Sequence, residues 1–159
     1  SWAGAFGFFQ FMPSTIRNYA LDYNNDNRID LKDNEDAYPS AANYLKEIGW
    51  EKDNPCFYQI ELDKDIPKKY LNISARKLHN KKKYSFFKKY IKNHEELNFI
   101  DNNMISAIIT PDKDIIPDAE TLSPAYVVFD NYEVILKWNR SLRFALAVCT
   151  LKNEFKNDI

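Results

Sequence analysis

The sequence has 159 residues, of which 45% are hydrophobic and 28% are charged, enough for one domain with a buried core. This composition excludes an intrinsically disordered chain, and no apolar run approaches the ~18 residues that a membrane-spanning helix requires. The formal net charge is −1, so the overall charge does not favour nucleic acid as a partner.

The first fifty residues contain the patterns of two helices. Pro13 suits the first turn of a short helix that we expect to end near residue 21, because the missing N–H of proline costs nothing there. Asp36 is an acceptable N-cap for a second helix, which Gly49 ends. The apolar face of this second helix is expected to consist of Tyr38, Ala41, Ala42, Leu45 and Ile48.

The rest of the chain mixes strands and helices. We expect a loop and strand within residues 54–66, short helices over 74–80 and 84–91, and strands over 104–110 and 126–129. Asp130 is expected to cap a helix through Trp138, and Ser141 to cap the last helix. The buried stripe of that last helix is expected to consist of Phe144, Ala145, Val148, Cys149 and Leu151. The fold class predicted is α+β, with helices at both ends and a small β-containing middle.

Two cysteines, Cys56 and Cys149, give little information. They lack the CxxC spacing of metal or redox sites. Cys149 lies in the apolar C-terminal helix, where it is expected to act as a small buried hydrophobic residue. A disulfide between the two in an oxidising compartment stays open, because the sequence does not give its geometry.

Residues 22–36 carry an acidic loop with the ligand spacing of an EF-hand-like calcium site. Asp22, Asn24 and Asp26 occupy the first, third and fifth positions, and the seventh, Arg28, offers its backbone carbonyl. Asp36 is the expected closing carboxylate. We therefore predict a structural calcium ion of weak affinity, about 10⁻⁴–10⁻³ M, as in extracellular modules.

Two positions of this loop depart from the usual pattern. Asn27 replaces the glycine of the sixth position, and asparagine tolerates the left-handed conformation better than most residues. The twelfth position is Asp33 instead of glutamate. The alternative to calcium is a solvated acidic turn that is closed by its own side chains.

The sequence resembles the membrane-bound lytic murein transglycosylase B family (glycoside hydrolase family 103). The resemblance is dense over residues 1–50 and 126–151, and faint between them. It is carried by Ser1-x-Ala3-Gly4-Ala5-x-Gly7-x-x-Gln10-Phe11-Met12-Pro13-Ser14, Tyr19-Ala20-x-Asp22, Asp36-Ala37-x-x-Ser40-x-Ala42-Asn43-Tyr44, Gly49-Trp50 and Trp138-Asn139-Arg140-Ser141.

This resemblance implies a lysozyme-like helical domain with a small β-containing insert. Residues 1–53 would form the helical part with the calcium loop, 54–125 the insert, and 126–159 the helices that return to the helical part. It further implies cleavage of the MurNAc-β-1,4-GlcNAc bond of peptidoglycan, in which the muramyl 6-hydroxyl attacks C1 and yields a 1,6-anhydro end. One glutamate acts as acid and then as base, because the nucleophile is already tethered in the substrate.

The family's catalytic glutamate is expected upstream of Ser1, so we expect the chain by itself to be inactive. The acids Glu35, Glu47, Glu51 and Glu133 match no catalytic position of the family. The non-enzyme alternative is a wall-binding protein that keeps the glycan groove and has lost the acid. A calcium-responsive helix–loop–helix module is a third hypothesis.

The resemblance also implies which residues contact the glycan. Ser1 would hydrogen-bond the catalytic glutamate, and Gln10 would bind a sugar amide or hydroxyl group. Asn139 would hydrogen-bond near the cleaved bond. Tyr44, Trp138 and Phe144 would line the groove. Packing within the fold is the alternative for each residue, and Arg140 is expected to anchor a helix or an acidic partner.

Residues 67–93 hold ten lysines and arginines and no acid. Interleaved aromatic residues allow nucleic-acid binding, but the favoured interpretation is a solvated lysine-rich surface. A third interpretation, between nucleic-acid binding and a solvated surface, is long-range attraction to anionic wall polymers or peptide-stem carboxylates. The partners expected are peptidoglycan glycan strands and no nucleic acid. We expect a periplasmic monomer, with membrane contact only through a lipid anchor in the full-length parent.

Overall fold

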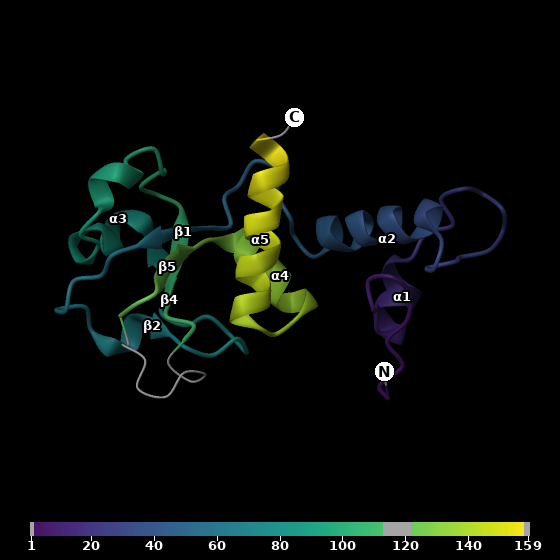
Figure 1. The fold of residues 1–159 in the computed structure, drawn as a ribbon, viewed down its shortest axis with the longest axis horizontal. Helices are drawn as coiled ribbons and strands as arrows, with labels where there is room; N and C mark the ends of the chain where they lie inside the picture. The colour runs from purple at the N-terminus through teal and green to yellow at the C-terminus, as the bar shows by residue number, and fades with distance from the viewer. Residues whose placement is uncertain (1, 113–121, 158–159) are drawn as a thin grey trace. The chain divides into compact units, whose positions relative to one another are not determined.

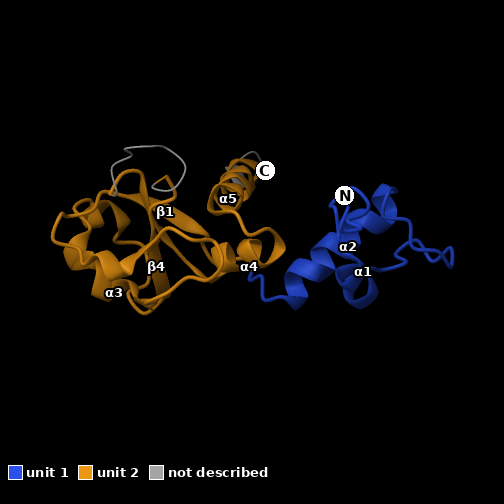
Figure 2. Ribbon diagram, turned by 90° about the horizontal axis from the view of Figure 1, so that it is seen from below, with its two compact units in different colours: residues 1–51 blue, residues 52–159 orange. Residues whose placement is uncertain are grey.

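The computed structural model describes residues 2–112 and 122–157, with side chains as far as Phe155. It divides into two compact units, Ser1–Glu51 and Lys52–Ile159 (Figure 2). The segments expected separately as insert and C-terminal helices share the second unit. The return of those helices to the helical part stays a prediction. Among the described residues, we find no helix with the length and apolar character that a membrane span requires.

The first unit contains two helices, α1 (Pro13–Tyr19) and α2 (Asn34–Glu47). Proline begins α1 as expected. The N-cap of α2 is Asp33 and not Asp36, since the Asp33 carboxylate accepts the Glu35 backbone N–H at 2.8 Å. The prediction of Asp36 as the cap was wrong because Asp36 is fully buried and bonds to the preceding loop instead.

The buried face of α2 also differs from the expected one. Ala37, Ser40 and Ala41 are buried, whereas Tyr38 is 59% exposed. The Ser40 hydroxyl accepts the backbone N–H of Leu21 at 2.9 Å. The helix thus buries polar side chains that accept hydrogen bonds from backbone N–H groups of the adjoining loop. The periodicity of apolar residues in the sequence does not reveal such a face.

The second unit is built on a small sheet with the strand order β1-β5-β4-β2 (Figure 1). A further strand, β3, pairs with β4. The strands are β1 (Phe57–Ile60), β2 (Leu71–Asn72), β3 (Lys82–Lys83), β4 (Ile105–Ile109) and β5 (Ala125–Val128). β5 is antiparallel to both β1 and β4, and β2 is parallel to β4. The strands predicted near residues 104–110 and 126–129 are confirmed.

The helices of this unit are α3 (Tyr84–Phe87), α4 (Asp130–Trp138) and α5 (Leu142–Asn157). Short 3₁₀ turns occupy Lys68–Tyr70, Lys88–Tyr90 and His94–Leu97. Ser141 caps α5 as predicted, since its hydroxyl accepts the Phe144 N–H at 3.2 Å. The prediction that Asp130 caps α4 was wrong, because Asp130 is the first residue of the helix and Phe129 is the N-cap residue. The helix predicted over residues 74–80 is absent.

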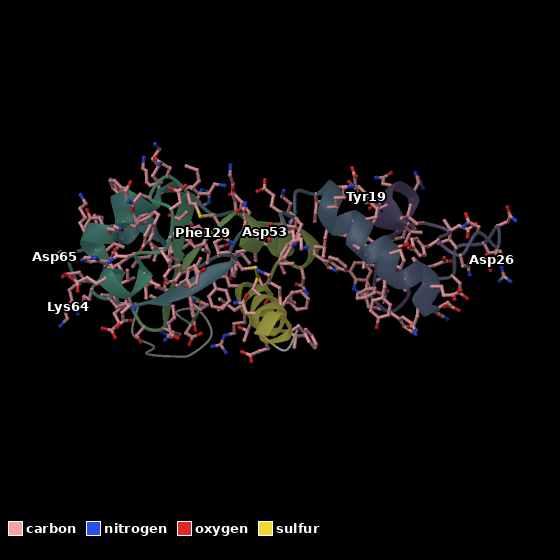
Figure 3. The ribbon with its side chains drawn as sticks, turned by 90° about the horizontal axis from the view of Figure 1, so that it is seen from above. Tyr19, Asp26, Asp53, Lys64, Asp65 and Phe129 are labelled. Carbon is pink, nitrogen blue, oxygen red and sulfur yellow. A yellow bond between two sulfur atoms is a disulfide. The ribbon has the colours of Figure 1, made fainter. Side chains whose placement is uncertain are left out.

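The core of the second unit lies between the sheet and the segments that cover it. Tyr84, Phe87, Ile108 and Val127 are fully buried there, and Phe129 lies inside the unit (Figure 3). The architecture is therefore α+β, as predicted.

A disulfide joins Cys56 to Cys149, with the two Cα atoms 6.0 Å apart. Both cysteines are buried, so the bond ties the chain before β1 to the middle of α5. The predicted stripe of α5 is only partly right. Ala145 and Cys149 are buried, but Phe144 and Leu151 are exposed.

Candidate functional site

Gln10 closes a tight loop near the start of the chain. Phe6 and Phe11 form an antiparallel bridge, with N–H to O distances of 3.0 and 2.9 Å. Gln10 has a φ of 51°, in the left-handed region, and its Nε2 donates to the Gly7 carbonyl at 2.9 Å. The exposed side chain is therefore held against its own turn. Because the amide has two N–H groups and one oxygen, hydrogen-bonding capacity remains for a ligand.

The backbone at Leu31, within the acidic loop, passes so close to Gly7 that a side chain there would collide with it. Phe8 donates its N–H to the Leu31 carbonyl at 2.9 Å. A Cβ atom on Gly7 would lie 2.6 Å from both that oxygen and the Leu31 Cβ. The glycine therefore permits a close backbone approach that holds the Gln10 loop.

Tyr44 lies in an aromatic cluster of the first unit. Its ring contacts Phe11 edge-on, with centroids 5.8 Å apart, and Tyr19 at 4.9 Å (Figure 3 labels Tyr19). Phe9 extends the cluster to Phe11 at 6.1 Å and to Tyr38 at 5.4 Å. Tyr44 is half-buried, and this burial raises the pKa of its hydroxyl, which stays protonated at neutral pH. Tyr44 therefore packs against Phe11 and Tyr19 and stays partly accessible to solvent.

Trp138, Asn139 and Phe144 lie around the connection between α4 and α5. Trp138 is the half-buried last residue of α4. Asn139 is exposed, donates its backbone N–H to Ile135 at 3.0 Å and accepts the Ser141 N–H at 2.8 Å. These backbone bonds fix the connection at Asn139, and Phe144 is exposed on the first turn of α5.

Gln10 and Tyr44 thus belong to the first unit, and Trp138, Asn139 and Phe144 to the second. Ser1 lies outside the described residues. The roles of these residues toward a glycan stay predictions. The sequence did not mark Phe9 and Tyr38 as candidates. Their partly accessible rings contact each other, and Phe9 joins the Tyr44 cluster through Phe11. The aromatic residues beside Gln10 in the sequence were a signal that could have indicated Phe9. The apolar periodicity of α2, in contrast, assigned Tyr38 to the buried face of the helix.

The acidic loop is organised by its own carboxylates and amides. The Asp22 carboxylate accepts the backbone N–H groups of Asp26 and Asn27, at 3.1 and 2.9 Å. The side-chain oxygens of Asn24 and Asp26 accept the N–H groups two residues further on, at 3.1 and 2.8 Å. Asn27 has a φ of 65°, so asparagine does adopt the left-handed turn expected at the usual glycine position. Figure 3 labels Asp26 within this loop.

Asp36 joins the two ends of the loop. It is 1% exposed and accepts the N–H groups of Asp30 and Tyr23, each at 2.8 Å. These bonds hold the pKa of the carboxyl below its ordinary value of 3.8, so Asp36 is ionised at neutral pH. Among the described residues, no group of three or more His, Cys, Asp or Glu side chains is arranged to hold a metal ion. The oxygen-rich donor set fits a hard cation, and calcium binding stays a prediction.

The four glutamates considered in the sequence analysis are all described by the structure. Glu35, Glu47 and Glu51 are exposed. Glu133 is half-buried and accepts a hydrogen bond from the Lys81 Nζ at 2.7 Å. This bond, with the nearby charges of Glu133 and Asp130, raises the pKa of the Lys81 ammonium. Glu133 is therefore an ion-pair partner on α4.

Comparison with known proteins agrees with the resemblance seen in the sequence. The membrane-bound lytic murein transglycosylase B of Escherichia coli (strain K12) is 52% identical over 52 residues, which are 33% of this chain and 14% of that protein. SltB3 from Pseudomonas aeruginosa, solved with NAG-NAM-pentapeptide and with NAG-anhNAM-pentapeptide, matches 98% of this chain with a TM-score of 0.80. Its identity is 30% in the first complex and 29% in the second, and the match covers 40% of SltB3.

The Escherichia coli lytic transglycosylase Slt35 in complex with calcium matches 95% of this chain with a TM-score of 0.68 and 25% identity, over 44% of its own length. The chain thus spans less than half the length of each of these relatives. The transglycosylase SLT domain family matches residues 1–153. Because this match covers nearly the whole chain and the fold agrees with SltB3, the chain belongs to the transglycosylase SLT domain family.

Proposed function

We propose that this chain is part of a peptidoglycan lytic transglycosylase, which cleaves the MurNAc-β-1,4-GlcNAc bond and leaves a 1,6-anhydro-MurNAc end. The observation that carries the proposal is the family match over residues 1–153. The SltB3 complexes support it, because that relative is solved with a NAG-NAM-pentapeptide and with its anhydro counterpart. This pair of ligands corresponds to the substrate and the product of such a reaction.

We propose that the chain supplies part of the glycan groove. Gln10 and Asn139 would hydrogen-bond sugar groups, and their exposed positions and backbone-anchored turns support this role. Tyr44, Trp138 and Phe144 would present partly accessible aromatic faces to pyranose rings. Ser1 would orient the catalytic glutamate.

None of the described acids is proposed as the catalytic acid. A general acid needs a carboxyl that holds a proton near neutral pH, whereas the pKa of the buried Asp36 is lowered. Glu133 already binds Lys81. We propose that the catalytic glutamate precedes Ser1 and that residues 1–159 by themselves do not cleave peptidoglycan.

The acidic loop is proposed to hold a structural calcium ion through Asp22, Asn24, Asp26, the Arg28 carbonyl and Asp36. The oxygen donors support this assignment, as does the calcium complex of the related Slt35. Calcium at about ten times its dissociation constant should stabilise the first unit by about 1.4 kcal/mol. Thermal unfolding with calcium and with magnesium tests this. Asp26→Asn should reduce the calcium effect, and Asp53→Asn, an exposed acid outside the loop, should leave it unchanged.

The cell envelope is the proposed location, because the relatives act on or bind cell-wall material by their names. The Cys56–Cys149 disulfide fits an oxidising compartment such as the periplasm. A monomeric state and a lipid anchor on the full-length parent stay predictions.

Muropeptide analysis tests the proposed activity. Purified sacculi are incubated with protein that includes the gene-encoded residues before Ser1, and the products are identified by mass spectrometry. The expected 1,6-anhydro ends are lighter by one water molecule than hydrolysed ends. Gln10→Ala should slow their release, whereas Gln59→Ala, an exposed glutamine on β1, should not. Reducing ends alone would contradict the proposal, and binding to sacculi without cleavage would favour the wall-binding alternative.

A further inference from the structure

Three adjoining hollows in the second unit surround the segment that links β2 to β3. The first has a volume of about 310 Å³, the second about 210 Å³ and the third about 220 Å³. Lys77 lines both the first and the second, and Arg140 lines both the second and the third. The three hollows, here called the cationic hollows, therefore adjoin one another.

Their described lining is strongly positive. It includes the cations Lys68, Lys69, Arg76, Lys77, Arg140 and Arg143. Glu133 is the acid among the described lining residues, and its carboxylate already bonds the Lys81 ammonium at 2.7 Å. The neighbouring Asp130 also faces Lys81, at 3.7 Å. Arg143 pairs with the Asp112 carboxylate. Among the described residues, no acid pairs with Arg76, Lys77 or Arg140, so the charge of these three cations can meet an external anion.

The shape of the surface distinguishes it from an ordinary solvated face. Lysines on a convex surface are fully hydrated and bind anions weakly. Here Arg76 and Arg140 line the same hollow, and the planar guanidinium group can bind a carboxylate through two parallel hydrogen bonds. The hollows thus suit ligands with several separated carboxylates.

The cationic hollows adjoin a proposed glycan contact in the sequence, because Arg140 lines two of them and directly follows Asn139. Asn139, proposed to bind a sugar, is followed directly by Arg140, so their Cα atoms are about 3.8 Å apart. An extended pentapeptide reaches about 17 Å. A peptide that branches from a sugar at Asn139 is therefore long enough to cross the hollow that Arg140 lines and to meet Arg76 and Lys77.

We propose that the cationic hollows bind the carboxylates of the peptide stems that branch from the glycan strand. This inference rests on the proposed function, because it assumes that Asn139 contacts the glycan. It assigns the recognition of the peptide part of the substrate to the segment between β2 and β3, and to the ends of α4 and α5.

A binding comparison tests the inference with the chain as it exists. The affinities of a GlcNAc-MurNAc-pentapeptide and of the same disaccharide without its peptide are measured by calorimetry at low and moderate salt. The wild type should bind the peptide-bearing ligand about tenfold more tightly, with a preference that weakens as salt rises. Arg76→Gln with Lys77→Gln should abolish this preference. The matched control is Lys64→Gln with Lys92→Gln, which changes the net charge equally at exposed lysines outside the hollows.

The outcomes separate the two proposals. Equal affinity of the wild type for both ligands would overturn the inference and leave the proposed function intact. Loss of the preference in the control variant would also overturn it, since general charge would then suffice. Tight binding to DNA that is lost in Arg76→Gln with Lys77→Gln would assign the surface to nucleic acid instead. Failure of the folded wild type to bind either ligand would contradict both proposals.

Discussion

The Gly7→Ala substitution should strongly destabilise the first unit. Gly7 has a φ of 77°, where an L-residue costs about 1–2 kcal/mol. The added Cβ would lie 2.6 Å from the Leu31 carbonyl oxygen, well inside the ordinary contact distance of about 3.5 Å. Since the obstacle is backbone, relief requires displacement of the loop, and overpacking of this kind costs about 1–3 kcal/mol. The expected loss in the free energy of unfolding is about 2–5 kcal/mol.

Gly4→Ala is the matched control for this prediction. Gly4 has a φ of 81°, but its added Cβ would lie 3.4 Å from the Pro13 Cγ, at the edge of ordinary contact. It should therefore cost about 1–2 kcal/mol, from the backbone conformation alone. Urea denaturation measures both losses, and hydrogen exchange at the Phe8 amide, which bonds to Leu31, reports the local opening. Equal losses in the two variants would refute the argument from close approach.

Three further predictions concern the disulfide, the acidic loop and the start of α5. Replacement of Cys56 and Cys149 by alanine removes a cross-link between residues 93 apart, which should lower the free energy of unfolding of the second unit by about 4.6 kcal/mol in urea denaturation; a midpoint equal to that of the oxidised wild type would contradict this. The stabilisation from ionised Asp36 should be complete above its ordinary pKa of 3.8 and disappear as the pH falls through its lowered pKa. Asp36→Asn should therefore flatten the stability profile between about pH 2 and 5, and an unchanged profile would refute the assignment. Tyr132→Phe removes the hydroxyl that donates to the buried Leu142 carbonyl at 2.7 Å, so thermal unfolding should show a loss of about 1–3 kcal/mol.

The elements with strong local signals could be predicted from the sequence. Pro13 begins α1, Ser141 caps α5, and the isoleucine-rich segment of residues 105–109 forms β4. The left-handed turn at Asn27 was also predictable, because the ligand spacing of the acidic loop requires it. In each case the structural requirement lies within a few residues of the signal.

The predictions failed where burial is decided by distant partners. Asp36 and Ser40 are buried because they accept backbone N–H groups from Tyr23, Asp30 and Leu21, and an apolar periodicity count treats both as surface residues. The same limit applies to the candidate site. The sequence marked Gln10 as a candidate by resemblance, but its left-handed φ and its bond to Gly7 follow from the bridge that closes the loop.

The segment after β2 shows how one buried residue overrides a local helical pattern. The Asn72 side chain donates to the Ile108 carbonyl at 2.9 Å, across the parallel pairing of β2 and β4, and accepts the His79 N–H at 2.6 Å. In a helix over residues 74–80, that N–H would instead bond to the carbonyl of Ala75. Since Asn72 is fixed by a strand 36 residues further along the chain, no local pattern could reveal this competition. The segment consequently runs as an open loop around Asn72, and this path allows Arg76 and Lys77 to line a concave surface rather than one side of a helix.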